Sequence, residues 1–428
     1  DVASAPVLKA MLDKTGRDVA VAASALRALA QIGEAEPIIA ILHAEKVDPN
    51  LQLEAVTALG TIKSQAALQR IQDFITDDWP TLRAAAIRAA AAIDPEGFPI
   101  VLSGMEPDPH WIVRAAIAEV LGTQPADIAI PRLRPMLDDE DKRVVPAAMA
   151  SLVKLKAPGV EEILLAHLKH GDAGIRAAAA RAIGELKPAA GPAALRDAFK
   201  AAQSDAGGDA RDAALGALAQ YGVAEAGELL RAALADRDWA LRLSAAALLR
   251  KLDPAAETVQ AIRPVPGTPI APYDSPALVA PAVSPHVFLE TAKGTIEIEL
   301  SVLDAPQTAQ NFIALARKGY FNGLQVHRVM PNFVVQDGDP RGDGTGGPGY
   351  TIRDELNERP FVRGTVGMAL SAPDTGGSQF FIMHSPAPHL DAKYTVFGHV
   401  VNGMEVVDRI QQLDVIQRVR VWDGKDLK

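Results

Sequence analysis

A repeat of about 31 residues runs through the first 252 positions and constrains the fold more than any other feature of the chain. Equivalent apolar positions recur in alanine- and leucine-rich stretches at spacings of 30, 31, 31, 31, 31, 35 and 30 residues. These positions are Leu29, Leu59, Ala90, Leu121, Leu152, Ile183, Leu218 and Leu248. A period of this length indicates a solenoid of about eight units, in which each unit buries its apolar face only by stacking on its neighbours.

Each unit is predicted to contain two helices. In one unit we expect a first helix over residues 127–137, a turn over 139–141 and a second helix over 142–155. Small residues dominate the second helices, as in residues 84–92, and alanine combines high helix propensity with close helix approach. Aspartates stand just ahead of several second helices, where a carboxylate can cap the unpaired amides of the first turn. These are Asp78, Asp108, Asp172 and Asp236.

Residues 253–285 differ in character from the repeats. Eight prolines fall in this stretch, and proline removes amide donors and favours extended backbone. We interpret the stretch as a semi-stiff linker. The alternative is that part of it packs against the last repeat through Val259, Ile262 or Ile270.

From Val287 onward the apolar period changes to two. Alternation over residues 296–300 indicates a half-buried strand, which we expect to form a hairpin with residues 287–291. Further strands are expected at 325–329, 333–337, 364–369, 380–383 and 396–401. Helices are expected at 306–317, with Asp304 as the N-cap, and at 404–413. Many short strands with two helices predict a closed antiparallel β-barrel over residues 286–428.

Charge and composition exclude several classes of protein. The 428 residues carry a net charge of −10 without a concentrated basic block, so the electrostatic footprint of a nucleic-acid binder is missing. The chain has no cysteine, which excludes disulfides and thiolate chemistry. No apolar run reaches the roughly 18 residues that a membrane-spanning helix needs. The missing initiator methionine and the absent cysteines favour an exported, envelope-associated location.

Two segments of the C-terminal region carry the functional signal. Residues 326–339 read VHRVMPNFVVQDGD, and residues 377–382 read GSQFFI. Four more motifs accompany them in order: APQTAQNF at 305–312, GTGG at 344–347, LD at 390–391 and VFG at 396–398. Over residues 286–422 this series resembles the cyclophilin-type peptidyl-prolyl isomerases. The repeats over residues 4–252 resemble short, alanine-rich HEAT repeats.

The resemblance implies a catalytic arginine at Arg328, with Phe333 and Gln336 beside it. Resonance opposes rotation about a peptide bond with a barrier of about 18–20 kcal/mol. A guanidinium near the imide nitrogen of an X-Pro bond would stabilise the twisted form more than either planar isomer. Arginine stays charged and has a rigid donor fork, so lysine would be a poor substitute.

The resemblance also implies a pocket for the proline ring and a polar rim for the substrate backbone. Phe333, Val334, Phe381 and Leu390 would form its walls. The full set of implied substrate-binding residues is Val334, Gly344, Ala369, Leu370, Ser371, Gln379, Phe381, His389, Leu390 and Tyr394. The main chain of residues 369–371 would pair with the residues preceding the proline.

Four of these residues depart from the best-known members of the family. Val334 replaces methionine and Leu370 replaces asparagine, while Tyr394 replaces histidine. His389 stands where those members carry a tryptophan that donates a hydrogen bond to the inhibitor cyclosporin. We therefore expect weaker inhibition by cyclosporin.

We expect neither a metal nor another cofactor. The acidic series from Asp337 to Asp343 fails as a calcium loop, because Arg341 occupies the third ligand place and Pro348 the twelfth. His327 precedes Arg328 on the same expected strand and should face the other way. We interpret this histidine as structural.

The sequence thus predicts an isomerase of X-Pro bonds in protein clients, acting as a folding helper, with the repeats binding a protein partner. The main alternative is a non-catalytic scaffold whose barrel only binds proline-containing peptides. The presence of Arg328 argues against this alternative, since a domain that only binds peptides needs no guanidinium at this position. A further alternative is chromophore chemistry, because the repeats also resemble those of phycobilin lyases, but the chain lacks a cysteine for it.

Overall fold

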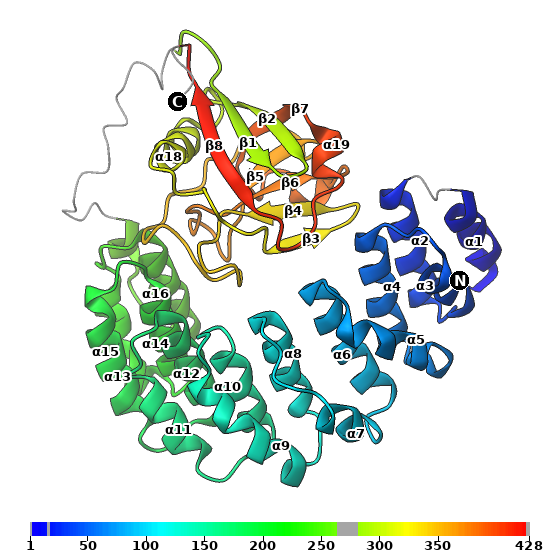
Figure 1. The fold of residues 1–428 in the computed structure, drawn as a ribbon. Coiled ribbons are helices and arrows are strands. Elements are labelled where there is room, and N and C mark those ends of the chain that lie inside the picture. Colours follow the sequence, from blue (N-terminus) through cyan, green and yellow to red (C-terminus); the bar gives the residue numbers. More distant parts are fainter. Residues whose placement is uncertain (1, 15–17, 263–280, 425–428) are drawn as a thin grey trace. The chain divides into compact units, whose positions relative to one another are not determined.

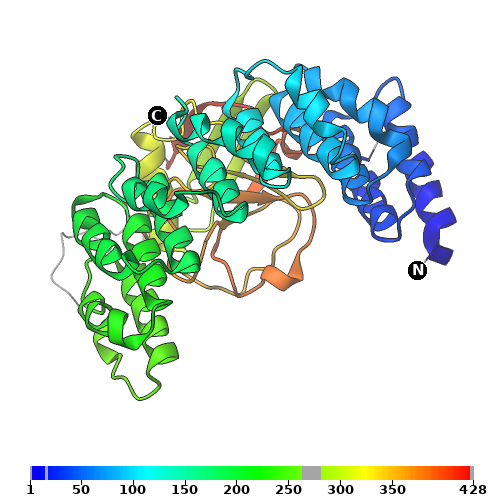
Figure 2. The same ribbon diagram turned by 90° about the horizontal axis from the view of Figure 1, so that it is seen from below.

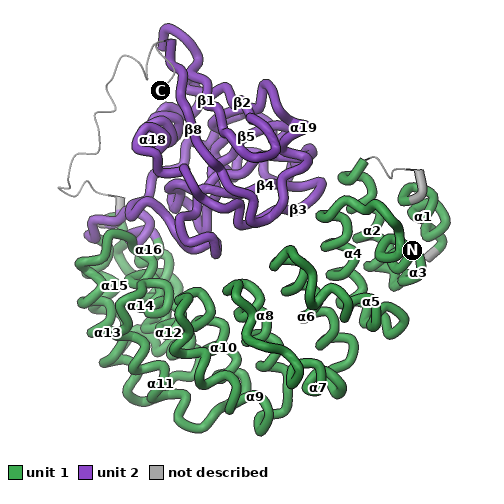
Figure 3. Tube along the Cα trace, in the orientation of Figure 1, with its two compact units in different colours: residues 1–234, 244–260 green, residues 235–243, 261–428 purple. Residues whose placement is uncertain are grey.

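A series of helix pairs precedes a β-sheet along the chain (Figures 1 and 2). The computed structural model describes residues 2–14, 18–262 and 281–424. The chain divides into two compact units (Figure 3), of which unit 1 comprises residues 1–234 and 244–260, and unit 2 comprises residues 235–243 and 261–428. No helix in the described ranges combines the length and the apolar character needed to cross a membrane.

The helices of unit 1 alternate between two layers. The second helix of each pair packs against the second helix of the next pair, from α2 on α4 through to α12 on α14. The helices are α1 (Ala5–Lys14), α2 (Val19–Gln31), α3 (Glu36–His43), α4 (Pro49–Thr61), α5 (Leu68–Asp73), α6 (Pro80–Ile93), α7 (Phe98–Ser103), α8 (Trp111–Leu121), α9 (Ala126–Leu133), α10 (Val145–Lys154), α11 (Val160–His167), α12 (Ala173–Leu186), α13 (Gly191–Ala201), α14 (Asp209–Ala219), α15 (Val223–Ala233) and α16 (Trp239–Leu252), the last of which is shared between the two units.

The predicted apolar repeat positions form the core of unit 1, with one correction. Seven of the eight, from Leu29 to Leu218, are at most 1% exposed. In the eighth unit the buried residue is Leu249, whereas the predicted Leu248 is only half-buried. The step from Leu218 to Leu249 is 31 residues, so the buried positions keep the 31-residue period more closely than the predicted step of 30 to Leu248.

Small residues let the second helices approach closely, as predicted. A Cβ at Gly60 would lie 2.7 Å from the Cβ of Ala89 on the next unit, and one at Gly184 would lie 3.0 Å from that of Ala217. The longer step before unit seven falls between α13 and α14, where a 3₁₀ turn (Ala202–Ser204) and a bend separate the two helices. The extra residues of the 35-residue step therefore lie in this connection.

Two helix boundaries and most of the predicted caps differ from expectation. The helix expected over 127–137 ends at Leu133 and continues as a 3₁₀ turn from Pro135, and the helix expected from 142 begins at Val145, with a proline in its first turn. Only Asp172 among the four aspartates caps a helix amide, that of Ile175 at 3.0 Å. Ahead of the other three second helices, an aspartate accepts the amide two residues further on.

Arginines in register connect successive units. Arg83 binds Asp108 through Nε and Nη2 at 2.8 Å each, and Arg114 binds Asp139 in the same way at the same distances. Nη1 of Arg114 also donates to two main-chain carbonyls at 2.9 and 3.0 Å. Asp139 raises the pKa of Arg114, against the opposing effect of burial. This bidentate geometry fixes the step from one unit to the next.

The strands of unit 2 form one curled antiparallel sheet in the order β3-β4-β6-β5-β7-β2-β1-β8. The strands are β1 (His286–Thr291), β2 (Gly294–Leu300), β3 (Arg328–Met330), β4 (Val334–Asp337), β5 (Thr365–Met368), β6 (Phe380–Met383), β7 (Val396–Asn402) and β8 (Ile416–Trp422). The predicted hairpin is present, with Val287 opposite Ile298. Strand β8 was not expected from the sequence.

The segment before β3 is bonded to the segment before β8. Val326 N donates to Asp414 O and Leu413 N donates to Val326 O, each at 2.8 Å. Ile416 N donates to Leu324 O at 2.9 Å. The first two bonds lie outside the named strands, and the third joins Ile416 of β8 to a residue outside them. The sheet is therefore curled, with β3 and β8 at its two ends.

Two helices accompany the sheet, α18 (Pro306–Arg317) and α19 (Met404–Val407). Asp304 is not the cap of α18. The carboxylate of Glu355 accepts the amides of Gln307 and Thr308 instead, at 3.0 and 2.7 Å, while Asp304 pairs with Arg359. Helix α19 stops well before the expected residue 413.

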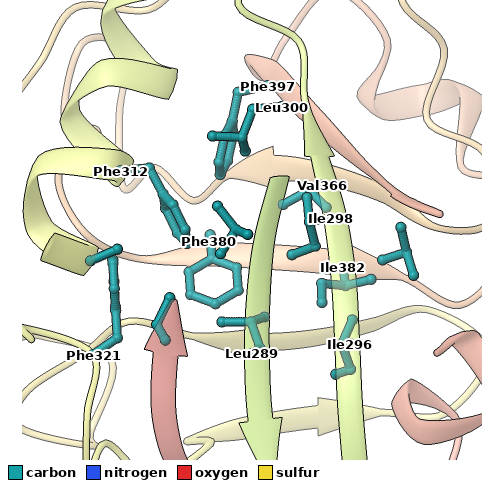
Figure 4. Packing of buried hydrophobic residues seen from close by; sticks show 14 of the residues in the cluster. Leu289, Ile296, Ile298, Leu300, Phe312, Phe321, Val366, Phe380, Ile382 and Phe397 are labelled. Atoms are coloured by element: carbon teal, nitrogen blue, oxygen red, sulfur yellow. The ribbon is translucent and has the colours of Figure 1, made fainter. Parts of the chain in front are cut away.

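Helix α18 covers the main apolar core of unit 2 (Figure 4). The ring of Phe312 stacks on that of Phe321, with centroids 4.7 Å apart, and meets the edge of Phe380 from β6 at 5.2 Å. Ile298 and Leu300 of β2 are at most 2% exposed in this core. Because side chains of the main core fill this face of the sheet, it leaves no room for a ligand, and the candidate site lies among the residues around Arg328.

Candidate active site

Arg328 and Gln336 lie opposite each other on β3 and β4. Directly opposed residues of an antiparallel pair point to the same face of the sheet. Nη1 of Arg328 donates to Oε1 of Gln336 at 3.0 Å. The guanidinium is exposed and Gln336 is half-buried, so strand pairing presents the arginine to solvent while one of its donors is fixed.

Gln336 is held in turn by a second glutamine. Nε2 of Gln336 donates to Oε1 of Gln379 at 3.1 Å. Nε2 of Gln379 donates to the carbonyl oxygens of Gly344 at 3.0 Å and Gly346 at 2.8 Å. This series of bonds links four of the predicted site residues and orients each amide, because each glutamine accepts through its oxygen and donates through its nitrogen.

The loop that carries Gly344 is organised by a buried carboxylate. Asp339 is 1% exposed, and its oxygens accept the amides of Arg341, Asp343 and Gly344 at 2.7, 3.0 and 2.5 Å. Within residues 2–14, 18–262 and 281–424, no three His, Asp or Glu side chains are placed to hold a metal ion. The carboxylate of Asp339 fixes the backbone of this loop through the three amides that it accepts.

A second neighbour of the arginine was not expected from the sequence. Nη2 of Arg328 lies 2.9 Å from Sδ of Met330, two residues along β3. Residues i and i+2 of a strand share a face, which places the thioether beside the guanidinium. Side-chain spacing alone could have indicated this contact, but the methionine resembled an ordinary strand residue.

An apolar cluster lies next to these polar groups and is separate from the main core. Val334 and Phe381 are 2% and 5% exposed, and the half-buried Phe333, Leu390, Tyr394 and Ala369 pack against them. All six were among the predicted substrate-binding or catalytic residues. The cluster also includes residues that the sequence did not indicate: Met330, Phe361, Met383, Ala387 and Val396.

Aromatic rings give this cluster its walls. The ring of Phe361 stacks on Phe381 at 5.5 Å, and Tyr394 meets the edge of Phe381 at 5.9 Å. His389 is exposed and stacks on Phe333, with centroids 6.1 Å apart and planes at 19°. The flat side chain at position 389 therefore extends the apolar surface outward from the cluster.

The segment predicted to pair with substrate is partly engaged with the protein itself. Ala369 packs on the apolar cluster, whereas Leu370 packs on the main core of unit 2. Ala369 N donates to Gln379 O at 3.0 Å, and Ser371 N donates to Thr375 Oγ1 at 2.9 Å. Leu370 thus serves the core rather than the apolar cluster.

Two buried ionisable groups lie behind the polar series. His327 is 9% exposed, and burial lowers its pKa. Asp337 is 2% exposed, and burial raises the pKa of its carboxyl to about 7, although the amide of Gly338 opposes the shift. His327 is buried while Arg328 is exposed, so the two side chains point to opposite sides, in line with the interpretation of this histidine as structural.

Known proteins resemble both the helical-repeat region and the C-terminal region of the chain. A model of the "Cyclophilin type peptidyl-prolyl cis-trans isomerase/CLD" family matches residues 286–424, and a model of HEAT repeats matches residues 35–105, 98–184 and 161–250. Among solved structures, a cyclophilin type peptidyl-prolyl cis-trans isomerase of Cryptosporidium parvum aligns at 29% sequence identity and a TM-score of 0.32, covering 33% of this chain and 100% of that chain.

Curated relatives match the C-terminal third of the chain at higher identity. Peptidyl-prolyl cis-trans isomerase B of Bacillus subtilis is 48% identical over 136 residues, which are 31% of this chain and 95% of that protein. A peptidyl-prolyl cis-trans isomerase of Helicobacter pylori is 46% identical over 142 residues, which are 32% of this chain and 87% of that protein. The chain belongs to the cyclophilin-type peptidyl-prolyl cis-trans isomerases.

As a cyclophilin, the chain is an enzyme that isomerises peptidyl-prolyl bonds, and the resemblance predicted from its motifs is confirmed. The predicted HEAT repeats are confirmed as well, over residues 35–250. This cyclophilin therefore joins an isomerase to a helical-repeat module of the kind that binds proteins.

Proposed function

We propose that Arg328 carries the isomerase reaction by donating to the imide nitrogen of a bound X-Pro bond. As the bond twists, resonance is lost and the nitrogen regains a lone pair that can accept a hydrogen bond. A donor aimed at this nitrogen stabilises the twisted state more than either planar isomer, and so lowers the barrier.

The observation that carries this proposal is the environment of the guanidinium. Its two side-chain acceptors among the described residues, Gln336 and Met330, are both neutral. In an ion pair a carboxylate would balance the charge of the arginine, whereas Gln336 and Met330 do not balance the charge of Arg328. The neutral acceptors orient the fork and leave its charge available to substrate.

We propose that the apolar cluster receives the proline ring. Phe333, Val334, Phe381 and Leu390 supply apolar surface next to Arg328. Gln336 and Gln379 would orient the peptide backbone at the rim, with Gly344 at its edge and the main chain of residues 369–371 pairing with the preceding residues. His389 and Tyr394 would complete the flat outer wall.

We propose three domains: repeats over residues 1–252, a linker over 253–285 and the isomerase over 286–428. Residues 263–280 of the linker lie outside the described residues. The hydrogen bonds of Val326 and Ile416 with the opposite segment support closure of the curled sheet into a barrel. The superhelical repeats would hold a protein partner or client. Such docking would raise the concentration of the client's prolines at the tethered isomerase.

Exchange spectroscopy by NMR on an Ala-Pro peptide separates this function from the scaffold alternative. Uncatalysed isomerisation takes tens to hundreds of seconds at 25 °C. A catalyst added at substoichiometric concentration brings cis and trans signals into exchange on the timescale of the experiment. A scaffold would shift the peptide resonances on binding but leave the rate of exchange between the isomers unchanged.

A further inference from the structure

Met330 is the neighbour of Arg328 that sequence analysis did not assign to the site. It lies on β3, is half-buried, and packs against the apolar cluster with Val334 opposite it on β4. Its sulfur lies 2.9 Å from Nη2 of Arg328. One side chain therefore touches both the guanidinium and the surface proposed to receive proline.

Two acceptors of different strength hold the two terminal nitrogens of the fork. The amide oxygen of Gln336 accepts from Nη1, and the sulfur of Met330 accepts from Nη2. A thioether is a weak acceptor, so it can orient Nη2 without binding it as tightly as an oxygen would. An oxygen at the same place would compete with substrate for the same donor.

We propose that Met330 is a positioning residue for Arg328 and that oxidation of its sulfur lowers isomerase activity. The inference rests on the proposed catalytic role of Arg328. In the modifying step the sulfur lone pair attacks one oxygen of hydrogen peroxide, the O–O bond breaks, a sulfoxide forms and water leaves. The new oxygen is a strong acceptor beside Nη2, and it places a polar group against the apolar cluster.

Burial separates Met330 from the other methionines of the sheet. Met368 and Met383 are 1% and 0% exposed, so solvent peroxide is excluded from both. Met404 is half-buried like Met330, but it packs against the main core and not against the apolar cluster. Met404 therefore offers a matched control of similar accessibility without a contact to the site.

Substitution tests the positioning role in the full chain. Met330→Leu keeps the apolar volume and removes the acceptor, and should lower kcat about fivefold with little change in KM, the effect of losing one weak hydrogen bond. Met330→Gln supplies a permanent oxygen acceptor and should lower kcat further. Thermal unfolding of each variant checks that the fold is kept. An unchanged kcat in a folded Met330→Leu variant overturns the positioning role.

Peroxide tests the modification. Wild type and Met404→Leu should lose activity about tenfold as mass spectrometry shows sulfoxide at Met330, and methionine sulfoxide reductase should restore it. Met330→Leu should keep its own activity under the same treatment. Wild-type protein that is fully oxidised at Met330 and still turns over at its original rate overturns the proposal.

A double variant distinguishes failure of this inference from failure of the proposed function. If Met330 acts through Arg328, then adding Met330→Leu to Arg328→Ala should change kcat no further. Full activity of Arg328→Ala alone would refute the proposed function. An inactive Arg328→Ala together with a fully active Met330→Leu would refute only the role of Met330.

Discussion

Arg328 donates to Gln336 across the β3–β4 pair at 3.0 Å. This single bond joins the arginine to which we assign the rotation of X-Pro bonds to the glutamine that would orient the substrate backbone. The pairing register determines the contact. A slip of one residue would turn one of the two side chains to the opposite face. Gln379 extends the same arrangement to the loop at Gly344.

Removing the side chain of Gln379 should disturb Arg328 indirectly, through Gln336, which bonds both residues. Gln379→Ala deletes the acceptor of Gln336 Nε2 and the two bonds to the glycine carbonyls. We expect kcat/KM to fall about tenfold, the effect of roughly 1.4 kcal/mol lost at the transition state. Gln411→Ala is the control, because the side chain of Gln411 bonds Lys293 and not a residue of the site. Equal losses of kcat/KM in both variants would contradict the role assigned to the hydrogen bonds of Gln379.

Asp337 should make the stability of the sheet fall as pH rises. Its pKa is raised by burial from an ordinary 3.8 to about 7. A raised folded-state pKa means that folding favours the protonated form of Asp337. Its contribution to the free energy of unfolding is therefore complete below about pH 4 and is lost as pH rises to about 7. The loss amounts to about 4 kcal/mol.

Asp337→Asn should remove this pH dependence. Native-state hydrogen exchange over residues 328–340 measures the pH dependence of local stability in the full chain. The variant should match wild type at pH 4 and exceed it in stability at pH 8. Parallel curves for the two proteins between these values would show that the carboxyl is not protonated in the folded state.

The arginines that connect the helical units should contribute strongly to stability. Arg114 and Asp139 are only 11% and 10% exposed in their side chains. Arg114→Met would leave a buried carboxylate without its partner, which costs about 3 kcal/mol in the free energy of unfolding. Arg88→Met removes a pair with Glu119 that is 43% and 50% exposed, and should cost less than about 1 kcal/mol. Urea unfolding followed by circular dichroism compares the two, and similar losses would contradict the assigned difference.

The residue at position 389 should govern inhibition by cyclosporin. The exposed imidazole of His389 stacks on Phe333, where the best-known family members carry tryptophan. His389→Trp should tighten inhibition at least about tenfold, since it restores a donor and apolar area. An inhibition titration measures the change. Wild type that is already inhibited as tightly as the variant would refute this view.

Much of the fold follows from periodicity, and the exceptions have local causes. Strand β8 escaped prediction because its buried residues are Ile416, Val419 and Val421. A register shift opposite Glu290 and Thr291 inserts an extra residue and interrupts the period of two.

Local signals also misplaced the ends of the two helices. The chain does not continue as a helix to residue 413, because Asp414 accepts the amide of Gln411 at 2.7 Å and Leu413 adopts a φ of 77°, which turns the chain toward β8. The N-terminal amides of α18 are bound by Glu355, which lies 47 and 48 residues away along the chain. No local signal could reveal that partner.

The site likewise contains residues that the sequence predicted and residues that it did not. The motif around Arg328 and Gln336 sits on adjacent strands, so short-range pairing brings it together as the sequence suggested. Phe361 reaches the apolar cluster from outside any strand and stacks on Phe381. Its place depends on tertiary packing, which a periodic pattern does not encode.

The most direct test of the account is the rate of cis/trans exchange in an Ala-Pro peptide with wild type and with Arg328→Ala. We predict that the variant keeps its affinity for the peptide, because the apolar cluster is intact. Its kcat should fall at least about 100-fold, as expected when a donor to the transition state is lost. A variant that binds the peptide and still exchanges it at the wild-type rate would contradict the central role of Arg328.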